Sequence, residues 1–218
     1  MAETLPSSLG AAALSKVAPE IYRLPAGHEL LRIWSSDTRY LSGFSQFRFF
    51  GPTSSRFDHH LPSSSGAPVI GDRGILYAVE QGSDAAISAL AEVFQSSRTI
   101  DLTTGKPFLS IFSTTLDLKL LDLTGHWTTR IGASALISSG RREICRGWSR
   151  DFYDAYPDID GIRYRSSMSG GGTIAFALFE RGLPAMPASP DVNLSLNDPV
   201  LRRTIAQAAR LLGFQITP

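Results

Sequence analysis

Segments with the apolar spacing of strands and segments with the spacing of helices are interspersed along this chain without regular alternation. Strand patterns fall at residues 28–34, 44–50, 74–79, 108–113, 116–123, 160–166 and 173–179. Helical patterns fall at residues 83–94, 127–156 and 199–212, the second being broken at Gly140. A doubly wound parallel sheet requires strands and helices to alternate regularly, so the sequence predicts an α+β fold instead.

The chain is long enough for one domain with short extensions at both ends. A protein of 218 residues can bury its own core without a metal or a disulfide. Residues 1–20 are small and polar, which predicts an N-terminal arm or a short helix. Residues 186–218 are predicted to form a linker, within the proline-rich run 184–199, and a C-terminal helix that packs on the domain. Residues 51–71 predict a long loop rich in Ser and Pro, and residues 169–172 a flexible glycine loop.

Cysteine, histidine and apolar patterns exclude several classes of protein. Cys145 is the only cysteine, so no intramolecular disulfide can form, and a buried structural thiol is expected. The adjacent His59 and His60 lack the spacing of metal ligands, so no metal site is predicted. No apolar run approaches the ~18 residues of a membrane span, and no signal peptide is recognisable, so we expect a cytoplasmic protein.

The basic residues are nearly all arginines, although the formal net charge is only +1. Of the 21 Lys and Arg residues, the lysines are only Lys16, Lys106 and Lys119. Codon bias explains such an excess without any function, and a solvated helix face is expected for Arg141, Arg142, Arg146 and Arg150. The alternative is that a few arginines bind an anionic ligand, because a planar guanidinium matches phosphate and carboxylate. The near-neutral charge predicts no direct nucleic-acid binding.

Four short segments, in order along the chain, carry a resemblance to a known family. They are Leu31-Arg32-Ile33, Ser55-Arg56-Phe57, the segment from Gly74 to Ala78 with Glu92 on the following helix, and the segment from Asp160 to Ser166 before an apolar strand. Together they resemble the RES domain family, whose name refers to an Arg, a Glu and a Ser. The resemblance spans residues 21–185, which it identifies as an NAD-binding catalytic domain.

The resemblance implies a fold similar to that of ADP-ribosyltransferases, with a mixed sheet core and flanking helices. It implies that NAD+ is a substrate and that no true cofactor is needed. The activity implied is that of a toxin from a bacterial toxin–antitoxin pair, neutralised by an Xre-like antitoxin. By position, the catalytic residues would be Glu92, Tyr77 and Arg32, and the NAD+-binding residues would be Arg32, Arg56, Tyr77 and Ser166.

Each residue of this predicted site has a chemical role that fits NAD+ cleavage. Glu92 could stabilise the cation that develops on the ribose, and Arg32 and Arg56 could bind the pyrophosphate in bidentate fashion. Tyr77 could stack on the nicotinamide, and Ser166, or its neighbour Ser167, could bind a ribose hydroxyl or the carboxamide. Each residue also has an ordinary alternative, such as a solvated glutamate or an arginine paired with a core carboxylate.

The sequence leaves the acceptor and the assembly open. Water, phosphate or a protein could receive the ADP-ribose, so a glycohydrolase or phosphorylase and an ADP-ribosyltransferase are both possible; a non-catalytic interaction module with this fold is the third possibility. The segment Ser54-Ser55-Arg56-Phe57 and the long loop at residues 51–71 depart from the common family pattern, which leaves the role of the loop open. The C-terminal helix could instead contribute to a homodimer or antitoxin interface. A catalytic function requires Arg32, Tyr77 and Glu92 to meet in one cleft.

Overall fold

A computed structural model describes residues 4–37, 42–168 and 172–218. The strands are β1 (Ile21–Leu24), β2 (Glu29–Ser35), β3 (Arg48–Gly51), β4 (Val69–Glu80), β5 (Thr99–Asp101), β6 (Pro107–Ser113), β7 (Leu118–Asp122), β8 (Gly161–Arg165), β9 (Ile174–Phe179), β10 (Val192–Ser195) and β11 (Gln215–Thr217). The helices are α1 (Ala11–Leu14), α2 (Ala85–Phe94), α3 (Trp127–Arg130), α4 (Arg142–Ala155) and α5 (Arg202–Leu212), with 3-10 turns η1 (Ala135–Ser138), η2 (Glu180–Ala185) and η3 (Pro199–Leu201).

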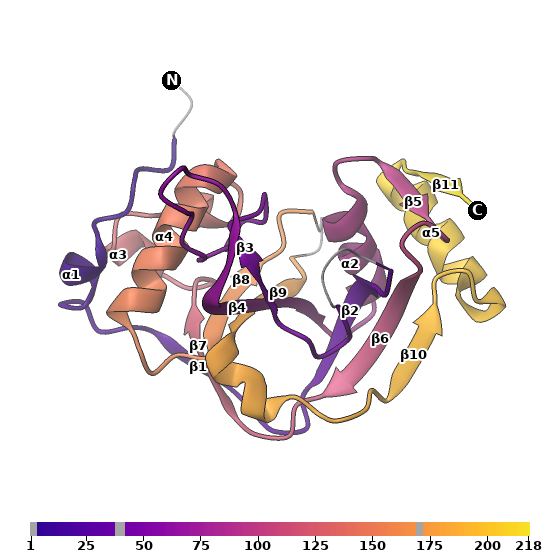
Figure 1. Cartoon of the computed structure of the whole chain (residues 1–218), viewed down its shortest axis with the longest axis horizontal. Coiled ribbons are helices and arrows are strands. Elements are labelled where there is room, and N and C mark those ends of the chain that lie inside the picture. Colours follow the sequence, from indigo (N-terminus) through magenta and orange to yellow (C-terminus); the bar gives the residue numbers. More distant parts are fainter. Residues whose placement is uncertain (1–3, 38–41, 169–171) are drawn as a thin grey trace.

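The described residues form one large curved sheet and one small sheet (Figure 1). The large sheet has the order β1-β7-β8-β9-β4-β2-β6-β10, with β3 pairing beside β4, and the small sheet pairs β11 with β5. The pairing of β7 with β8 is parallel, whereas the other pairs of the large sheet are antiparallel. The expected α+β fold with a mixed sheet and flanking helices is therefore confirmed.

Both faces of the central strands are buried, which explains their continuous apolar sequence. Every residue of β9 is buried, and β4 alternates between two apolar clusters. Ile75 and Val79 belong to the larger cluster, while Leu76 and Ala78 belong to the smaller one on the opposite face. A strand covered on both faces needs apolar residues at successive positions rather than at alternate ones.

Two groups of helices lie over different parts of the sheet (Figure 1). Helices α1, α3 and α4 form one group, and Trp148 and Phe152 of α4 are fully buried there. Helices α2 and α5 form the other group, in which α2 packs against β2 and β4. The helical pattern at residues 127–156 forms α3, η1 and α4 rather than one helix. A Cβ atom at Gly140 would lie 2.8 Å from the Leu136 carbonyl oxygen, which fits the break predicted at that glycine.

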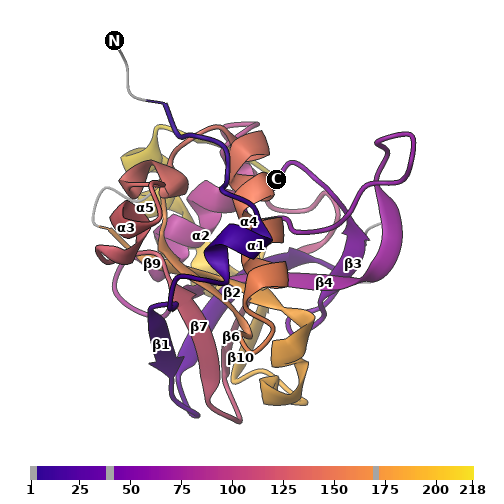
Figure 2. The same ribbon diagram turned by 90° about the vertical axis from the view of Figure 1, so that its left-hand side faces the viewer.

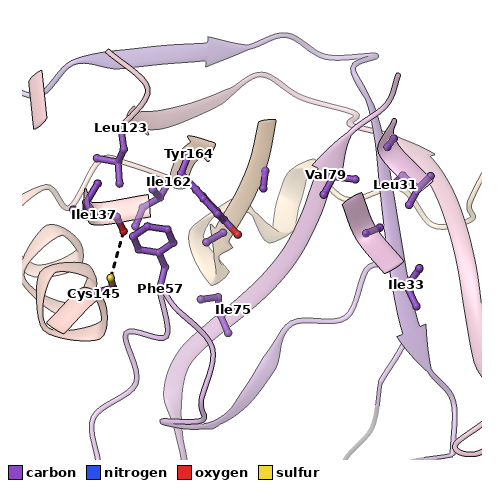
Figure 3. Packing of buried hydrophobic residues seen from close by; sticks show 14 of the residues in the cluster. Leu31, Ile33, Phe57, Ile75, Val79, Leu123, Ile137, Cys145, Ile162 and Tyr164 are labelled. Atoms are coloured by element: carbon purple, nitrogen blue, oxygen red, sulfur yellow. Dashed lines mark hydrogen bonds between the residues drawn. The ribbon is translucent and has the colours of Figure 1, made fainter. Parts of the chain in front are cut away.

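Strands β2 and β4 pair over only two positions and then part. Leu30 pairs with Glu80 and Leu31 with Val79. On its other edge, β2 pairs with β6 along its whole length. The first part of β4, from Val69 to Ile75, pairs with β3 and forms with it the hairpin that projects from the side of the molecule in Figure 2. Figure 3 shows Leu31 close to Val79 where the strands meet, with Ile33 and Ile75 on their diverging parts. Residues 76–78 of β4 therefore have no register partner on this side.

The chain ends are tied to the domain more closely than the sequence indicates. The linker predicted at residues 184–199 contains β10, which pairs antiparallel with β6 as an edge strand. This part of the linker prediction was wrong because the prolines bound a strand of four residues rather than exclude one. At the other end, the Trp148 indole donates to the Pro6 carbonyl at 2.9 Å, and the Tyr156 hydroxyl donates to the Leu14 carbonyl at 2.8 Å.

Helix α5 lies on the domain through Ile205, Ala208 and Ala209, which are buried. The Asp198 side chain accepts from the Val200 backbone N–H at the start of η3, where Pro199 takes the first position, as in an ordinary cap.

In the described part of the chain, no helix combines the length and the apolar character that crossing a membrane requires. Residues 169–171 of the predicted glycine loop lie outside the described residues.

A buried polar cluster joins the start of η2 to β4 and α4. The Glu180 carboxylate accepts from the Gly74 backbone N–H at 2.8 Å and from the Tyr153 hydroxyl at 2.5 Å, and its Oε2 lies 3.6 Å from His59 Nε2. Burial by itself disfavours the charged carboxylate, but these contacts with His59, Tyr153 and Gly74 lower the pKa of Glu180 to about 2. The charged form of Glu180 thus stabilises the fold.

Substituting Glu180 with Gln should lower stability at neutral pH and flatten its acid dependence. Because the pKa is lowered in the folded state, the contribution is complete above the unfolded value of about 4.3 and is lost as pH falls toward 2. We expect Glu180→Gln to cost about 1–3 kcal/mol at pH 7 and to reduce the loss of unfolding free energy between pH 5 and pH 2. Urea unfolding across this pH range measures both; equal slopes for wild type and variant would contradict the prediction. Glu143→Gln, at an exposed position, is the matched control.

Candidate functional site

A cleft of about 510 Å³ lies where β2 and β4 part. Its walls come from β2, β4 and α2, from the loop before β4 and from the start of α4. Four of the residues predicted from the sequence line this cleft, namely Arg32, Arg56, Tyr77 and Glu92. The structure thus brings Arg32, Tyr77 and Glu92 together, as a catalytic function requires.

Glu92 lies in the last turn of α2 and is held by Ser166. The Ser166 hydroxyl donates to Glu92 Oε1 at 2.6 Å, and the Met168 backbone N–H donates to the same hydroxyl oxygen at 3.2 Å. Ser166 is buried and is absent from the cleft lining, so the structure places it behind the carboxylate. Ser167 is exposed, and its hydroxyl accepts from Arg56 at 3.3 Å. The two serines therefore contact different residues of the predicted site.

Arg32 enters the cleft from β2 without a carboxylate partner among the described residues. Its Nη1 donates to the Gln46 carbonyl at 3.1 Å. Burial and the nearby Arg48 charge lower the pKa of Arg32 to about 10, so the guanidinium remains charged at neutral pH. The alternative role for Arg32, a pair with a core carboxylate, is not found in the described structure. A charged, partly desolvated guanidinium of this kind is suited to binding an anion.

The loop at residues 51–71, whose role the sequence left open, forms one wall of the cleft around a buried carboxylate. Asp58 is completely buried and accepts from Arg48 at 2.9 Å and from the Thr53 backbone N–H at 2.7 Å. The His60 ring nitrogen Nδ1 lies 2.5 Å from the other carboxylate oxygen. Burial opposes the charge, but His60, Arg48 and Thr53 together hold the pKa of Asp58 well below its usual range.

Arg56 projects from the same loop and is anchored on both sides. The next residue, Phe57, is fully buried against Tyr164, with ring centroids 4.6 Å apart, in the cluster that Figure 3 shows. The Arg56 guanidinium donates to the Gly140 carbonyl at 2.6 Å and lies 3.6 Å from the Cys145 sulfur. Burial raises the pKa of Cys145 despite this contact, which fits the expected buried structural thiol.

Arg48 and Arg142 are cleft residues that the sequence interpretation missed. Arg142 was expected on a solvated helix face, but it lines the cleft and donates to the Gln95 side chain and, at 3.4 Å, to the Ser54 carbonyl. Helical spacing grouped Arg142 with Arg146, yet Arg142 stands in the first turn of α4 and extends across to α2. The position of Arg48 depends on its pairing with Asp58, and no sequence signal indicated that pair.

The Tyr77 hydroxyl is a buried polar group without a hydrogen-bond partner among the described residues. It lines the cleft from β4, with Ser55 and the Phe57 backbone as nearby polar groups. Burial, and then the charge of Asp58, raise the pKa of Tyr77 above its usual value, so the hydroxyl keeps its proton. A buried hydroxyl left unpaired costs free energy, which a polar ligand in the cleft would recover.

These features define an α+β protein with a cleft lined by one glutamate and by several arginines that have no carboxylate partner among the described residues. The RES domain matches residues 29–199, and the chain belongs to this family, as the resemblance predicted. A search of curated proteins gave no match. Among solved structures, the fold is similar to a chain in the crystal structure of the M. tuberculosis MbcT-MbcA toxin-antitoxin complex. The TM-score is 0.52 and the identity 15%, over 94% of this chain and 98% of that chain.

Substituting Asp58 with Asn should destabilise the protein strongly. The amide would leave Arg48 without the negative charge that compensates it and His60 without its carboxylate partner. We expect a loss of about 3–5 kcal/mol in the free energy of unfolding, measured by urea denaturation at pH 7. The control is Asp72→Asn on the same hairpin, where the side chain is exposed and little change is expected. An Asp58→Asn variant as stable as the control would show that this carboxylate does not stabilise the loop between β3 and β4.

Proposed function

We propose that this protein cleaves NAD+ at the bond between nicotinamide and ribose, with water or phosphate accepting the ADP-ribose. The observation that carries the proposal is the convergence of Arg32, Arg56, Tyr77 and Glu92 on one cleft of a RES domain. A volume of about 510 Å³ lies within the range of roughly 300–1,000 Å³ typical of small-molecule sites.

The charges in the cleft are complementary to NAD+. The pyrophosphate is anionic, and Arg32 and Arg56 offer guanidinium groups that no carboxylate of the described residues neutralises. Bidentate contacts between guanidinium and phosphate are stronger than neutral hydrogen bonds. The cationic nicotinamide riboside end would lie toward Glu92, the one carboxylate among the described residues that line the cleft.

Cleavage of the bond between nicotinamide and ribose depends more on stabilising the developing cation than on an acid that protonates the leaving group. The bond between ribose C1′ and the pyridinium nitrogen breaks, its electron pair goes to the nitrogen, and nicotinamide leaves as a neutral molecule. Positive charge develops on the ribose, and a carboxylate beside it stabilises the transition state more than the ground state. An oxygen of water or phosphate then adds to C1′, water giving up a proton as it adds. In this proposal Glu92 favours both steps.

Tyr77 and Ser166 have supporting roles in this proposal. The aromatic ring of Tyr77 would pack on the nicotinamide, and its unpaired hydroxyl would bind a polar group of the substrate. Ser166 would act on Glu92, to which it donates, instead of on the ribose or carboxamide that the sequence suggested.

We also propose that the protein is the toxin of a toxin–antitoxin pair and that an Xre-like protein neutralises it. The family and the fold shared with a chain of a toxin–antitoxin complex support this proposal. Consumption of NAD+ would stop growth in the cytoplasm unless a partner blocked the cleft. Co-expression with the product of the neighbouring gene, followed by co-purification, tests the partner.

Substituting Glu92 with Gln should lower nicotinamide release by at least ~100-fold, a barrier increase of about 2.7 kcal/mol, because the amide cannot balance the developing cation. Purified protein is incubated with NAD+, with and without phosphate, and nicotinamide is quantified. Expressed in cells, the wild type should deplete NAD+ and stop growth, whereas the Glu92→Gln variant should not. The matched control Glu143→Gln is exposed and should behave as wild type. No nicotinamide under any acceptor condition would refute the proposal, and labelled NAD+ that tags a protein would indicate ADP-ribosyl transfer.

Substituting Arg32 with Lys should weaken NAD+ binding by about 10- to 150-fold, because the bidentate, charge-assisted contact, worth roughly 1.5–3 kcal/mol, is lost. Titration calorimetry in the Glu92→Gln background measures the affinity without turnover. Arg210→Lys, on the exposed side of α5, serves as the control. Unchanged affinity in the Arg32 variant would remove this residue from phosphate binding.

A further inference from the structure

We propose that Gln95 and Arg142 are positioning residues that orient Glu92 for the reaction. The inference rests on the proposed function, in which Glu92 is the catalytic carboxylate. It concerns a chain of side-chain hydrogen bonds that starts outside α2, at the first turn of α4, and ends on the Glu92 carboxylate.

The contacts form one continuous chain. Arg142 Nη2 donates to the Gln95 side-chain oxygen Oε1, and Gln95 Nε2 donates to Glu92 Oε2 at 3.4 Å and to the Glu92 backbone carbonyl at 2.7 Å. From the opposite side, Ser166 donates to Glu92 Oε1 at 2.6 Å. Both carboxylate oxygens of Glu92 therefore meet a donor, and each donor comes from a different segment of the chain.

Arg142 fixes which way the Gln95 amide faces. A guanidinium only donates, so the amide oxygen must face Arg142 and the amide NH2 must face Glu92. With Arg142 removed, the amide oxygen would lose its donor, and the amide would be less firmly held where its NH2 reaches the carboxylate. The charge of Arg142 also polarises the amide, which strengthens donation toward Glu92.

The geometry assigns Arg142 to Glu92 more directly than to the substrate. Its two terminal nitrogens are engaged, one by Gln95 and one by the Ser54 carbonyl at 3.4 Å. A free glutamate side chain has several rotamers, and holding it in one productive orientation avoids an entropic loss during the reaction. This device differs from the binding role proposed for Arg32, whose one hydrogen bond among the described residues is to a backbone carbonyl.

The test compares Gln95→Met, Arg142→Gln and the double variant in the nicotinamide-release assay. Each single variant should lower kcat about tenfold while KM changes less than about threefold, because substrate contacts remain. The double variant should also fall about tenfold, not a hundredfold, because both residues act through one chain. Arg142→Lys should restore part of kcat.

The matched control is Arg141→Gln, one residue earlier, where the exposed guanidinium pairs with Glu143 at 2.9 Å. It should match wild type in kcat and KM. A raised KM with unchanged kcat in Arg142→Gln would overturn the inference and make Arg142 a substrate-binding residue. Multiplying effects in the double variant would also overturn it.

A second measurement separates this inference from the proposed function. If the wild type releases no nicotinamide, the proposed function fails, but the chain of hydrogen bonds can still be tested by NMR without substrate. The Gln95 side-chain amide signals should change position in Glu92→Gln, which removes the charge that accepts from the amide, and in Arg142→Gln, which removes the donor to the amide oxygen. Gln95 signals indifferent to both substitutions would overturn the inference whatever the enzyme assay shows.

Discussion

The parting of β2 and β4 is the constraint on which the rest of this structure depends. Each strand is held firmly elsewhere, β2 by seven register positions with β6 and β4 by five with β9, so neither can move to close the gap. Helix α2 packs on both and keeps them at a fixed separation. Backbone groups along residues 76–78 of β4 lack a strand partner on this side, and such groups are costly if they are buried and dry. A gap of this kind stays open to water or to a ligand, and the cleft occupies it.

The electrostatic character of the cleft comes from the local distribution of charge and not from the net charge of +1. Asp58 neutralises Arg48 inside the wall, and this pairing stabilises the loop without reducing the charge of the other arginines. Arg32, Arg56 and Arg142 keep their charges and meet neutral partners among the described residues, mainly carbonyl and amide oxygens. Glu92 is the one carboxylate among the described lining residues. The cleft therefore combines guanidinium groups without carboxylate partners among the described residues with a single carboxylate.

Sequence reasoning predicted the parts that depend on local pattern and missed those that depend on how distant segments meet. Apolar spacing predicted α2 and β9, and the family resemblance pointed to Arg32, Tyr77 and Glu92, which the fold brings together. Spacing alone did not distinguish Glu92 from a solvated glutamate, because the distinguishing contact comes from Ser166, 74 residues further along. Arg142 was misplaced because helical periodicity describes the middle of α4 and not a first-turn residue that extends to another helix.

The position of Glu92 on α2 explains why it needs donors from outside the helix. It lies in the last turn, where the carbonyl end of the helix carries partial negative charge and disfavours a carboxylate. The side-chain amide of the C-cap residue Gln95 donates a hydrogen bond to the Glu92 backbone carbonyl, one of the carbonyl groups that the end of the helix leaves without a helical partner. Arg142 lies against this end of α2, where a cation is favourable, and so offsets the helix dipole and the carboxylate together. The Glu92 carboxylate, at a helix C-terminus, is thus held by residues of α4 and of the turn that follows β8, and the cleft joins these segments around it.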